Sequence, residues 1–276
     1  MRDAVEPQLT PLLEPLFEAA EIGSGPLPPA LAQLHGGQLD LRRTLLFANF
    51  VTSLDGITAP DPKAEGQGGL ISGGAPADRF LMGLLRSFAD AVLVGAGTLR
   101  AESRHRWTPG RVYPPAADGY ARLRRALGLS PEPPLAVVTG SGRIDPRAPG
   151  LAGGLILTTP AGAALLSDSV PEGVRVRVVG EGPRLPVAAA VGALREAGFR
   201  SILTEGGPHL FGELVAARLV DELFLTLSPV LAGRDPGGVQ LGLVEGVPLL
   251  PDIDRRARLL SARRGGSHLF LRYRLG

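Results

Sequence analysis

The sequence contains no cysteine, which excludes disulfide bonds, thiolate nucleophiles and cysteine-ligated zinc. Histidine is scarce as well: only His35, His105, His209 and His268 occur, and no two of them stand at the spacing of a metal site. Lysine is almost missing, because Lys63 is the only one and all other basic side chains are arginine. We therefore expect no metal centre, and the guanidinium groups are the candidates for binding anions.

Three longer signals are also missing. No uncharged apolar run reaches the roughly 18 residues of a membrane span. The chain does not begin with a basic segment followed by an apolar one, so no secretory leader is expected and the cytoplasm is the default compartment. No long basic run with aromatic residues occurs, and the net charge is only +2. A nucleic-acid partner is therefore not expected.

The composition, with 44% hydrophobic and 20% charged residues, is that of a globular protein. Residues 1–43 are rich in proline, and we interpret them as an N-terminal arm lying on the domain or on a partner subunit. Within the arm, a short amphipathic stretch predicts one or two helical turns, formed by Leu9, Leu12, Leu13, Leu16 and Phe17. Residues 44–276 are interpreted as a single domain without an internal linker.

Apolar runs predict buried strands at 45–52, 91–94, 135–139, 155–158, 201–204 and 223–231. The alternation of valine with arginine over 174–178 predicts a further strand with one wetter face. Helices are predicted between them, with Pro76, Pro186 and Pro208 at three of the helix starts. Segments 259–262 and 269–273 flank Arg263–Gly266 as a C-terminal hairpin. Because strands alternate with helices, the sequence predicts an α/β fold: a three-layer α/β/α sandwich around a mostly parallel sheet, with an antiparallel hairpin at its end. The long apolar strand 223–231 and the arm also suggest a homodimer.

Two glycine-rich turns follow predicted central strands. In the first, the strand 91–94 runs into Gly95-Ala96-Gly97-Thr98, and a helix starting at Thr98 would turn its free amides toward a phosphate. In the second, the strand 201–204 runs into Glu205-Gly206-Gly207-Pro208. Both turns lie at carboxyl ends of strands, where open α/β sheets bind ligands. Each alone also fits an unliganded turn, but two in one sheet favour a dinucleotide site, although neither is a full Rossmann fingerprint.

Two further groups are candidates for substrate binding. The predicted strand 45–52 ends in a polar cluster in which Asn49, Ser53 and Asp55 either shape a turn or project toward a ligand. Arg86 stands late on the helix after Pro76, either as a solvated side chain or as a clamp for a phosphate or carboxylate.

These motifs, in this order, resemble the reductase domain of bacterial riboflavin biosynthesis, which is related in fold to dihydrofolate reductase. The resemblance covers roughly residues 44–275 and rests on four segments: 53–56, 89–98, 205–208 and 220–223. Segments 73–79 and 99–102 look most like a stand-alone pyrimidine reductase family. The zinc-dependent deaminase that accompanies this domain in bifunctional relatives needs cysteine ligands, so this chain cannot contain it.

The resemblance implies a set of site residues. NADPH would contact Val51, Gly95, Ala96, Gly97, Thr98, Glu102, Ser141, Gly206, Gly207, Pro208, Leu210 and Phe211. Arg86 and Glu205 would contact a ribitylated pyrimidine, together with Asn49 and Ser53. Asp55 or Glu205 would orient the substrate or relay a proton, and Arg143 is the candidate for the 2′-phosphate of the cofactor.

The chain departs from the bifunctional relatives on the substrate side. Asn49 replaces a frequent lysine, Glu102-Ser103-Arg104 replaces Asp-Asp-Pro, and Gly68-Gly69-Leu70 replaces a loop with serine and tryptophan. We therefore predict an NADPH-dependent reductase of 5-amino-6-(5-phosphoribosylamino)uracil or a close analogue. Two alternatives stay open, namely a dihydrofolate or pterin reductase and a non-catalytic NADPH-binding protein.

Overall fold

The computed structural model describes residues 10–22, 25–41, 44–251 and 256–276. These residues form a ten-stranded sheet in the order β1-β11-β12-β9-β2-β8-β4-β5-β6-β7, and a small second sheet pairs β10 with β3. All neighbours from β9 to β7 run parallel, whereas β1, β11, β12 and β9 are joined by antiparallel pairing. The strands are β1 Glu14–Glu18, β2 Leu45–Thr52, β3 Ile57–Ala59, β4 Ala91–Gly95, β5 Leu135–Thr139, β6 Leu155–Thr158, β7 Arg175–Val178, β8 Ser201–Thr204, β9 Glu222–Leu227, β10 Leu241–Gly242, β11 Ala257–Gly265 and β12 His268–Leu275.

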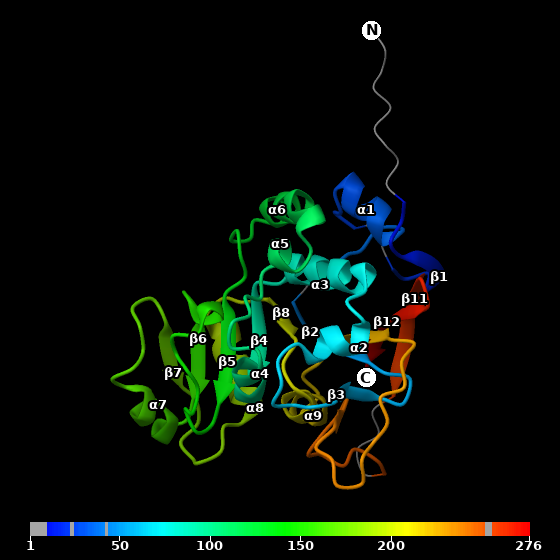
Figure 1. The fold of residues 1–276 in the computed structure, drawn as a ribbon. Helices are drawn as coiled ribbons and strands as arrows, with labels where there is room; N and C mark the ends of the chain where they lie inside the picture. Colours follow the sequence, from blue (N-terminus) through cyan, green and yellow to red (C-terminus); the bar gives the residue numbers. More distant parts are fainter. Residues whose placement is uncertain (1–9, 23–24, 42–43, 252–255) are drawn as a thin grey trace.

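Helices cover both faces of the large sheet (Figure 1). They are α1 Pro29–His35, α2 Gln67–Ser72, α3 Pro76–Phe88, α4 Ala96–Ala101, α5 Pro109–Val112, α6 Ala117–Ala126, α7 Pro160–Leu166, α8 Val187–Glu196 and α9 Pro208–Ala216, with 3₁₀ turns η1 Pro114–Ala116 and η2 Pro149–Leu151. Helices α1, α3 and α6 contribute to the core on one face, and α8 and α9 to the core on the other. The predicted three-layer α/β/α sandwich with a mostly parallel sheet is confirmed.

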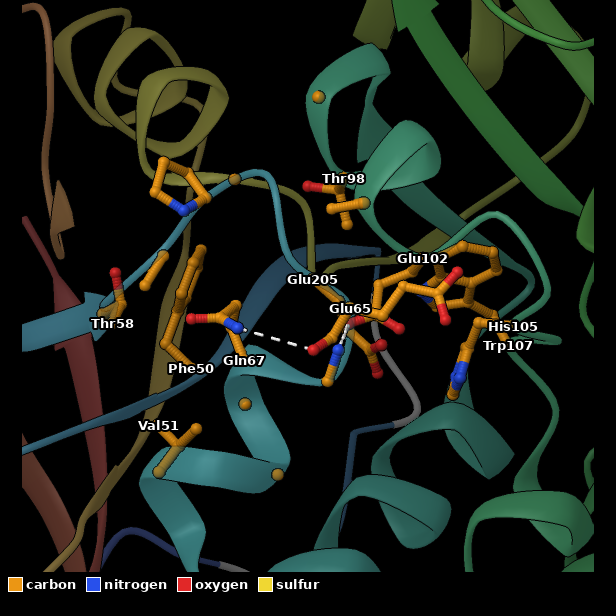
Figure 2. A pocket seen from close by; sticks show the side chains of 18 of the residues that line it. Phe50, Val51, Thr58, Glu65, Gln67, Thr98, Glu102, His105, Trp107 and Glu205 are labelled. Atoms are coloured by element: carbon orange, nitrogen blue, oxygen red, sulfur yellow. Dashed lines mark hydrogen bonds between the residues drawn. The ribbon is translucent and has the colours of Figure 1, made fainter. Parts of the chain in front are cut away.

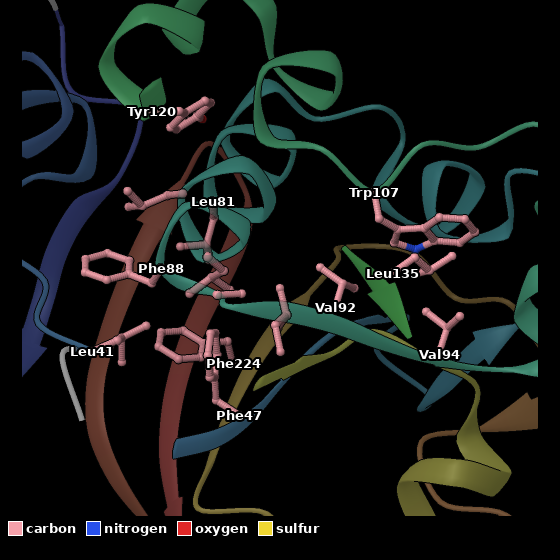
Figure 3. Close-up of a cluster of buried hydrophobic side chains, with 14 of the residues drawn as sticks. Leu41, Phe47, Leu81, Phe88, Val92, Val94, Trp107, Tyr120, Leu135 and Phe224 are labelled. Carbon is pink, nitrogen blue, oxygen red and sulfur yellow. The ribbon is translucent and has the colours of Figure 1, made fainter. Parts of the chain in front are cut away.

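Side-chain alternation along β4 explains how one strand serves two cores. Val92 and Val94 pack with α3, whereas Leu93, between them, packs with α8 and α9. Successive residues of a strand point to opposite faces, so a strand covered on both sides must be apolar throughout. Figure 3 shows the first of these cores, where Val92 and Val94 lie among aromatic and aliphatic side chains. This is why the central strands stand out in the sequence as continuous apolar runs.

The predicted strand 223–231 is too long. Strand β9 ends at Leu227, and Leu231 is 74% exposed. Pro229 has no amide hydrogen to continue the ladder, which accounts for the early end. Moreover, β9 lies inside the sheet between β12 and β2, so it offers no free edge to a second copy. The homodimer stays a prediction, and this strand no longer supports it.

The N-terminal segment contains a strand where the amphipathic pattern predicted helical turns. Strand β1 pairs with β11, with Pro15 opposite Arg263. Pro15 disfavours a helix here, because a proline inside a helix removes one hydrogen bond and clashes with the preceding turn. An edge strand tolerates the same residue. Leu9 lies outside the described residues.

The C-terminal hairpin is longer than predicted. Strand β11 continues through Arg263 and Arg264 to Gly265, and the turn is formed by Gly266 and Ser267. Arg263 was expected in the turn, yet it is buried, and its Nε donates to the carbonyl oxygen of His35 at 3.1 Å. The hairpin therefore extends far enough to pair with β1. Arg263 and Arg264, which were expected in a solvated turn, belong to strand β11.

Candidate functional site

A cleft of about 1280 Å³ opens at the carboxyl ends of β2, β4 and β8. These three strands are parallel neighbours in the sheet, so the segments that follow them meet at one edge, as in other open α/β sheets. Strand β2 contributes Asn49 and Val51, the turn after β4 contributes Gly95–Thr98, and the turn after β8 contributes Glu205, Gly207 and Pro208. The two glycine-rich turns, strand β2 and Arg86 thus meet at one cleft.

The two glycine-rich turns touch each other. A Cβ atom added to Gly206 would lie 2.3 Å from the Cα atom of Val94, so only glycine allows the backbone after β8 to pack on β4. A Cβ atom on Gly207 would lie 3.2 Å from the hydroxyl oxygen of Thr98. Gly206 itself is not part of the cleft lining. It brings the second turn against the first, and the two turns form one continuous wall.

Helix α4 begins at Ala96 rather than at Thr98, with Gly95 as its N-cap residue. The prediction of the helix start was therefore wrong by two residues. Gly97 lies inside the first helical turn with nothing but the guanidinium of Arg100 near its missing side chain, at 4.0 Å. A glycine in this position costs some helix stability but leaves the adjoining part of the cleft open.

Arg86 and Glu205 form a buried ion pair at the floor of the cleft. The Nε and Nη2 atoms of Arg86 donate to the two carboxylate oxygens of Glu205 at 2.9 and 2.6 Å. The side chains are only 2% and 7% exposed, respectively. Two parallel hydrogen bonds are the strongest geometry that arginine and a carboxylate can adopt. Arg86 is therefore not a solvated helix side chain, and most of its donors are already used within the protein.

The remaining donors of Arg86 point to the segment after α4. Its Nη2 atom lies 3.2 Å from the Nε2 atom of His105, and its Nη1 atom lies 3.5 Å from the carbonyl oxygen of Thr108. Burial, together with the positive charges of Arg86 and Arg111, lowers the pKa of His105 to about 4. His105 is thus neutral at physiological pH and belongs to the same hydrogen-bonded chain as Glu205.

Arg124, from helix α6, holds the end of the helix that carries Arg86. It is 1% exposed, and its Nη1 atom donates to the carbonyl oxygens of Arg86 and Ala89 at 2.9 and 2.8 Å. A cation at a helix C-terminus satisfies carbonyl groups that the helix itself leaves unpaired. Burial lowers the pKa of Arg124 to about 10, so it stays charged. Arg124 therefore fixes the backbone position from which Arg86 reaches the cleft.

Ser53 and Asp55 shape a turn and do not line the cleft. The hydroxyl of Ser53 donates to Asp55 at 2.5 Å, and the amides of Ala232 and Gly233 donate to the same carboxylate. The Ser53 hydroxyl and these amides lower the pKa of Asp55 to about 2. The structure therefore places Asp55 away from any substrate in the cleft, in the turn-forming role that such residues usually have.

The predicted cofactor residues divide into two groups. Val51, Gly95, Ala96, Gly97, Thr98, Glu102, Gly207, Pro208 and Leu210 line the cleft, whereas Ser141, Arg143, Gly206 and Phe211 do not. Phe211 is core, with its ring 4.7 Å from that of Phe50. Ser141 and Arg143 lie just beyond the wall, where the carbonyl oxygen of Arg143 accepts a hydrogen bond from Arg100 at 3.0 Å.

Glu102 closes one end of the cleft. Its carboxylate accepts a hydrogen bond from the amide of Gly66 at 2.7 Å, across the cleft from its own helix. Ser103 adds a hydrogen bond to Glu65 at 3.3 Å. Burial raises the pKa of Glu102, and the Gly66 amide opposes that shift. The loop before α2 is therefore fastened to the segment after α4, and Figure 2 shows Glu65 and Glu102 on facing segments.

Sequence reasoning missed two stretches of the cleft lining, one between positions 58 and 82 and one between positions 100 and 112. The second stretch is polar and rich in arginine and carried no site prediction beyond Glu102, yet it supplies a wall of the cleft with the residues Arg104, His105, Arg106, Trp107 and Arg111. Asp78 was also missed: it lines the cleft and is 5% exposed, and burial raises its pKa. The signal in the sequence that could have indicated this wall is the pair of His105 and Trp107 within an arginine-rich segment.

Within the ranges that the structure describes, no group of three histidine, aspartate or glutamate residues is arranged to hold a metal ion. Among the same residues, no helix is both long and apolar enough to cross a membrane.

Comparison with known families decides what this site belongs to. The model of the RibD C-terminal domain matches residues 44–270. The chain belongs to the RibD C-terminal domain family. The resemblance inferred from the four sequence motifs is thereby confirmed. No curated protein sequence gives a match.

Solved structures share the fold at low sequence identity. A pyrimidine reductase-like protein from Corynebacterium diphtheriae has a TM-score of 0.64 at 22% identity, over 91% of this chain and 96% of that one. The riboflavin biosynthesis reductase Rib7 from Saccharomyces cerevisiae has a TM-score of 0.58 at 15% identity, over 91% and 95%. A diaminohydroxyphosphoribosylaminopyrimidine deaminase/5-amino-6-(5-phosphoribosylamino)uracil reductase from Thermotoga maritima has a TM-score of 0.55 at 17% identity, and this chain covers 57% of it. These likenesses establish a shared fold.

Proposed function

We propose that this member of the RibD C-terminal domain family is an NADPH-dependent reductase whose substrate is 5-amino-6-(5-phosphoribosylamino)uracil or a close pyrimidine analogue. Family membership supports the reaction class. The observation that carries the proposal is the meeting of two glycine turns and a buried arginine–glutamate pair in one cleft. A dinucleotide site and a polar substrate site would then lie side by side, as hydride transfer requires.

The residues of the cleft fit a dinucleotide. Gly97 leaves space where a side chain would project, with no atom within 4 Å except the Arg100 guanidinium at that limit. The cleft lining has an excess of cations over carboxylates, which favours phosphate groups. The cations are Lys63, Arg79, Arg86, Arg100, Arg104, Arg106 and Arg111, and the carboxylates are Glu65, Asp78, Glu102 and Glu205. The guanidinium of Arg100 donates to the backbone carbonyl oxygen of Arg143 at 3.0 Å, so two arginines stand together there, which supports a subsite for the 2′-phosphate.

When bound, the dinucleotide would supply the hydride, and the residues of this chain would position the two reactants. Thr98 and Gly207 would hold the cofactor, because they stand where the two turns meet. The carboxylate of Glu205 would accept hydrogen bonds from amino or ring N–H groups of the substrate, with Arg86 fixing its orientation. Asn49, only 8% exposed, would add an amide donor and acceptor from β2. Asp55 has no part in this proposal.

The decisive experiment measures dinucleotide binding and turnover with the full chain. We expect NADPH to raise the melting temperature more than NADH does, and reduction of the pyrimidine to consume NADPH. Gly97→Val should abolish the NADPH-induced shift without lowering the melting temperature of the free protein by more than a few degrees. Gly192→Ala is the matched control, since a Cβ atom on Gly192 in helix α8 meets no other atom within 4 Å. If neither dinucleotide changes the melting temperature, the proposal is wrong.

The same assay addresses the alternatives that the sequence left open. Turnover of dihydrofolate in preference to the pyrimidine would make the protein a pterin reductase. Tight NADPH binding with no oxidation by any pyrimidine or pterin would favour a non-catalytic binding protein. No feature of the cleft favours either alternative over the pyrimidine reductase, so one candidate is proposed.

A further inference from the structure

His105 lies in the cleft wall formed by the segment after α4, opposite Phe50 and Thr58 in the view of Figure 2. Its position is fixed from two sides. The backbone amide of His105 donates to the carbonyl oxygen of Glu102 at 2.9 Å, and the imidazole ring stands at 75° to the ring of Trp107, with centroids 4.8 Å apart. Trp107 is itself 4% exposed. The imidazole therefore has little freedom to turn.

The contact with Arg86 determines which nitrogen of His105 carries the proton. The Nη2 atom of Arg86 lies 3.2 Å from Nε2, and a guanidinium can only donate hydrogen bonds. Nε2 must therefore present its lone pair, so the neutral ring carries its hydrogen on Nδ1. Arg86 cannot be reversed to relieve this requirement, because its other donors are held by Glu205 and by the carbonyl oxygen of Thr108.

A second proton on the ring is opposed by its surroundings. Burial of the imidazole disfavours its charged form, and the positive charges of Arg86 and Arg111 add to that effect, so that the pKa falls to about 4. The carboxylate at the other side of Arg86, Glu205, is engaged by Arg86 itself. His105 is thus one fixed tautomer over the physiological range, with Nδ1–H as its only donor. Among the described residues, no hydrogen bond uses this donor.

We propose that His105 is a specificity-determining residue that presents the Nδ1–H group to a hydrogen-bond acceptor on the substrate ring. The inference rests on the proposed reductase function and adds the chemistry of one substrate position. A ring carbonyl oxygen can accept this hydrogen bond, whereas an amino group in the same place would set two donors against each other. Glu205, at the other end of the same chain, accepts only. The site therefore distinguishes a carbonyl edge from an amino edge.

The tautomer can be measured directly in the full chain. With only four histidines, their ring nitrogens can be assigned by NMR after substituting each one. We expect His105 to be protonated on Nδ1 and unprotonated on Nε2 at neutral pH, and to titrate below pH 5. His268 is the internal reference of opposite kind, because its Nε2 lies 3.0 Å from the carbonyl oxygen of Ser72 and must carry the proton. A proton on Nε2 of His105, or titration near the ordinary histidine value, overturns the inference.

Two substitutions separate the donor from the packing. His105→Phe keeps a flat ring beside Trp107 but removes both nitrogens, whereas His105→Asn keeps an N–H near the position of Nδ1. We expect His105→Phe to raise KM for 5-amino-6-(5-phosphoribosylamino)uracil about tenfold, the factor that one lost hydrogen bond corresponds to. His105→Asn should recover part of this loss, and the Kd for NADPH should change in neither variant. A purely structural role predicts parallel losses in both variants and in NADPH binding.

An analogue with an amino group in place of one ring carbonyl tests the specificity. The unmodified protein should prefer the carbonyl compound, and His105→Phe should lose most of that preference. Unchanged preference in an active variant overturns the inference while leaving the reductase function intact. If instead the protein binds no dinucleotide, the proposed function fails separately. In that case the inference is tested by adding the carbonyl compound and recording the Nδ1–H resonance of His105. If this resonance does not change, the inference is overturned.

Discussion

Glu205→Gln and Arg86→Met test whether the buried ion pair is an integral part of the fold as well as of the cleft. Each substitution leaves one charged group buried without its partner, since Arg86 is 2% exposed and Glu205 7% exposed. Leaving a buried charge unpaired typically costs roughly 3–5 kcal/mol. We expect Arg86→Met to lower the free energy of unfolding by about 4 kcal/mol, and Glu205→Gln by about 3 kcal/mol, because glutamine retains one acceptor for the guanidinium.

The double variant distinguishes pairing from burial. At the observed 2.6 Å, two unit charges attract by about 6 kcal/mol at an effective dielectric constant of roughly 20. Desolvation offsets most of that attraction, so replacing both partners removes the cost that each leaves behind. We therefore expect Arg86→Met/Glu205→Gln to be more stable than the sum of the single losses by at least about 2 kcal/mol.

Urea unfolding, with linear extrapolation and a check that the denaturant dependence is unchanged, measures these free energies. The exposed pair of Arg177 and Glu196, with side chains 40% and 69% exposed, provides the control. Glu196→Gln should cost less than about 1 kcal/mol. Single-variant losses below about 1 kcal/mol at Arg86 and Glu205, or losses that simply add in the double variant, would refute the reasoning about a desolvated pair.

Other predictions follow from residues that support the cleft. Gly206→Ala should unfold the protein or lower its melting temperature by roughly ten degrees or more, because the new Cβ atom would lie 2.3 Å from the Cα atom of Val94. Core strain of this kind costs roughly 3 kcal/mol or more. An unchanged thermal melt would contradict the packing. Arg124→Met should cost about 3 kcal/mol in urea unfolding, since charged hydrogen bonds to carbonyls are lost, and Arg124→Lys should recover part of it. His35 has a pKa of about 3 in the folded protein and an ordinary value of 6.5 in the unfolded chain. As the pH falls, the unfolded chain therefore takes up this proton before the folded protein does. Its contribution to stability is complete above pH 6.5 and is lost as the pH falls toward about 3; His35→Phe should show a smaller loss of unfolding free energy over that range, and equal losses would count against burial of the neutral ring. Asp78 has a raised pKa in the folded protein, so its ionisation opposes folding above the pKa of the unfolded chain, and Asp78→Asn should gain stability relative to the unmodified protein as the pH rises from 4 to 8 (roughly the range above the unperturbed aspartate value).

The central part of the fold followed directly from local sequence. Strands β2, β5, β6 and β8 have the predicted bounds, because a strand buried on both faces must be apolar along its whole length and therefore leaves a continuous signal. The errors occur where long-range pairing decides. Segment 14–18 became a strand because β11 is there to pair with it, and the apolar run 223–231 ends early at Pro229.

The candidate site was predictable where backbone geometry fixes it. The glycine turns that follow β4 and β8 were expected at the ligand-binding edge of the sheet, and the cleft brings Thr98 and Gly207 together with Asn49 of β2. Side chains whose role depends on a distant partner were not predictable. Ser53 and Asp55 looked identical to ligand-binding residues in sequence, yet the amides of Ala232 and Gly233 take the Asp55 carboxylate into a turn.

By itself, the sequence determined the class of fold, the family and the positions of the two glycine turns, because buried strands and turn residues leave signals within a few neighbouring residues. Only the tertiary structure decided what the charged groups do. Arg86 and Glu205 are separated by 119 positions, and His105 by 19 from the first of them, so nothing local indicates that they form one chain of hydrogen bonds. Their roles are set by desolvation, which depends on what the whole molecule packs around them.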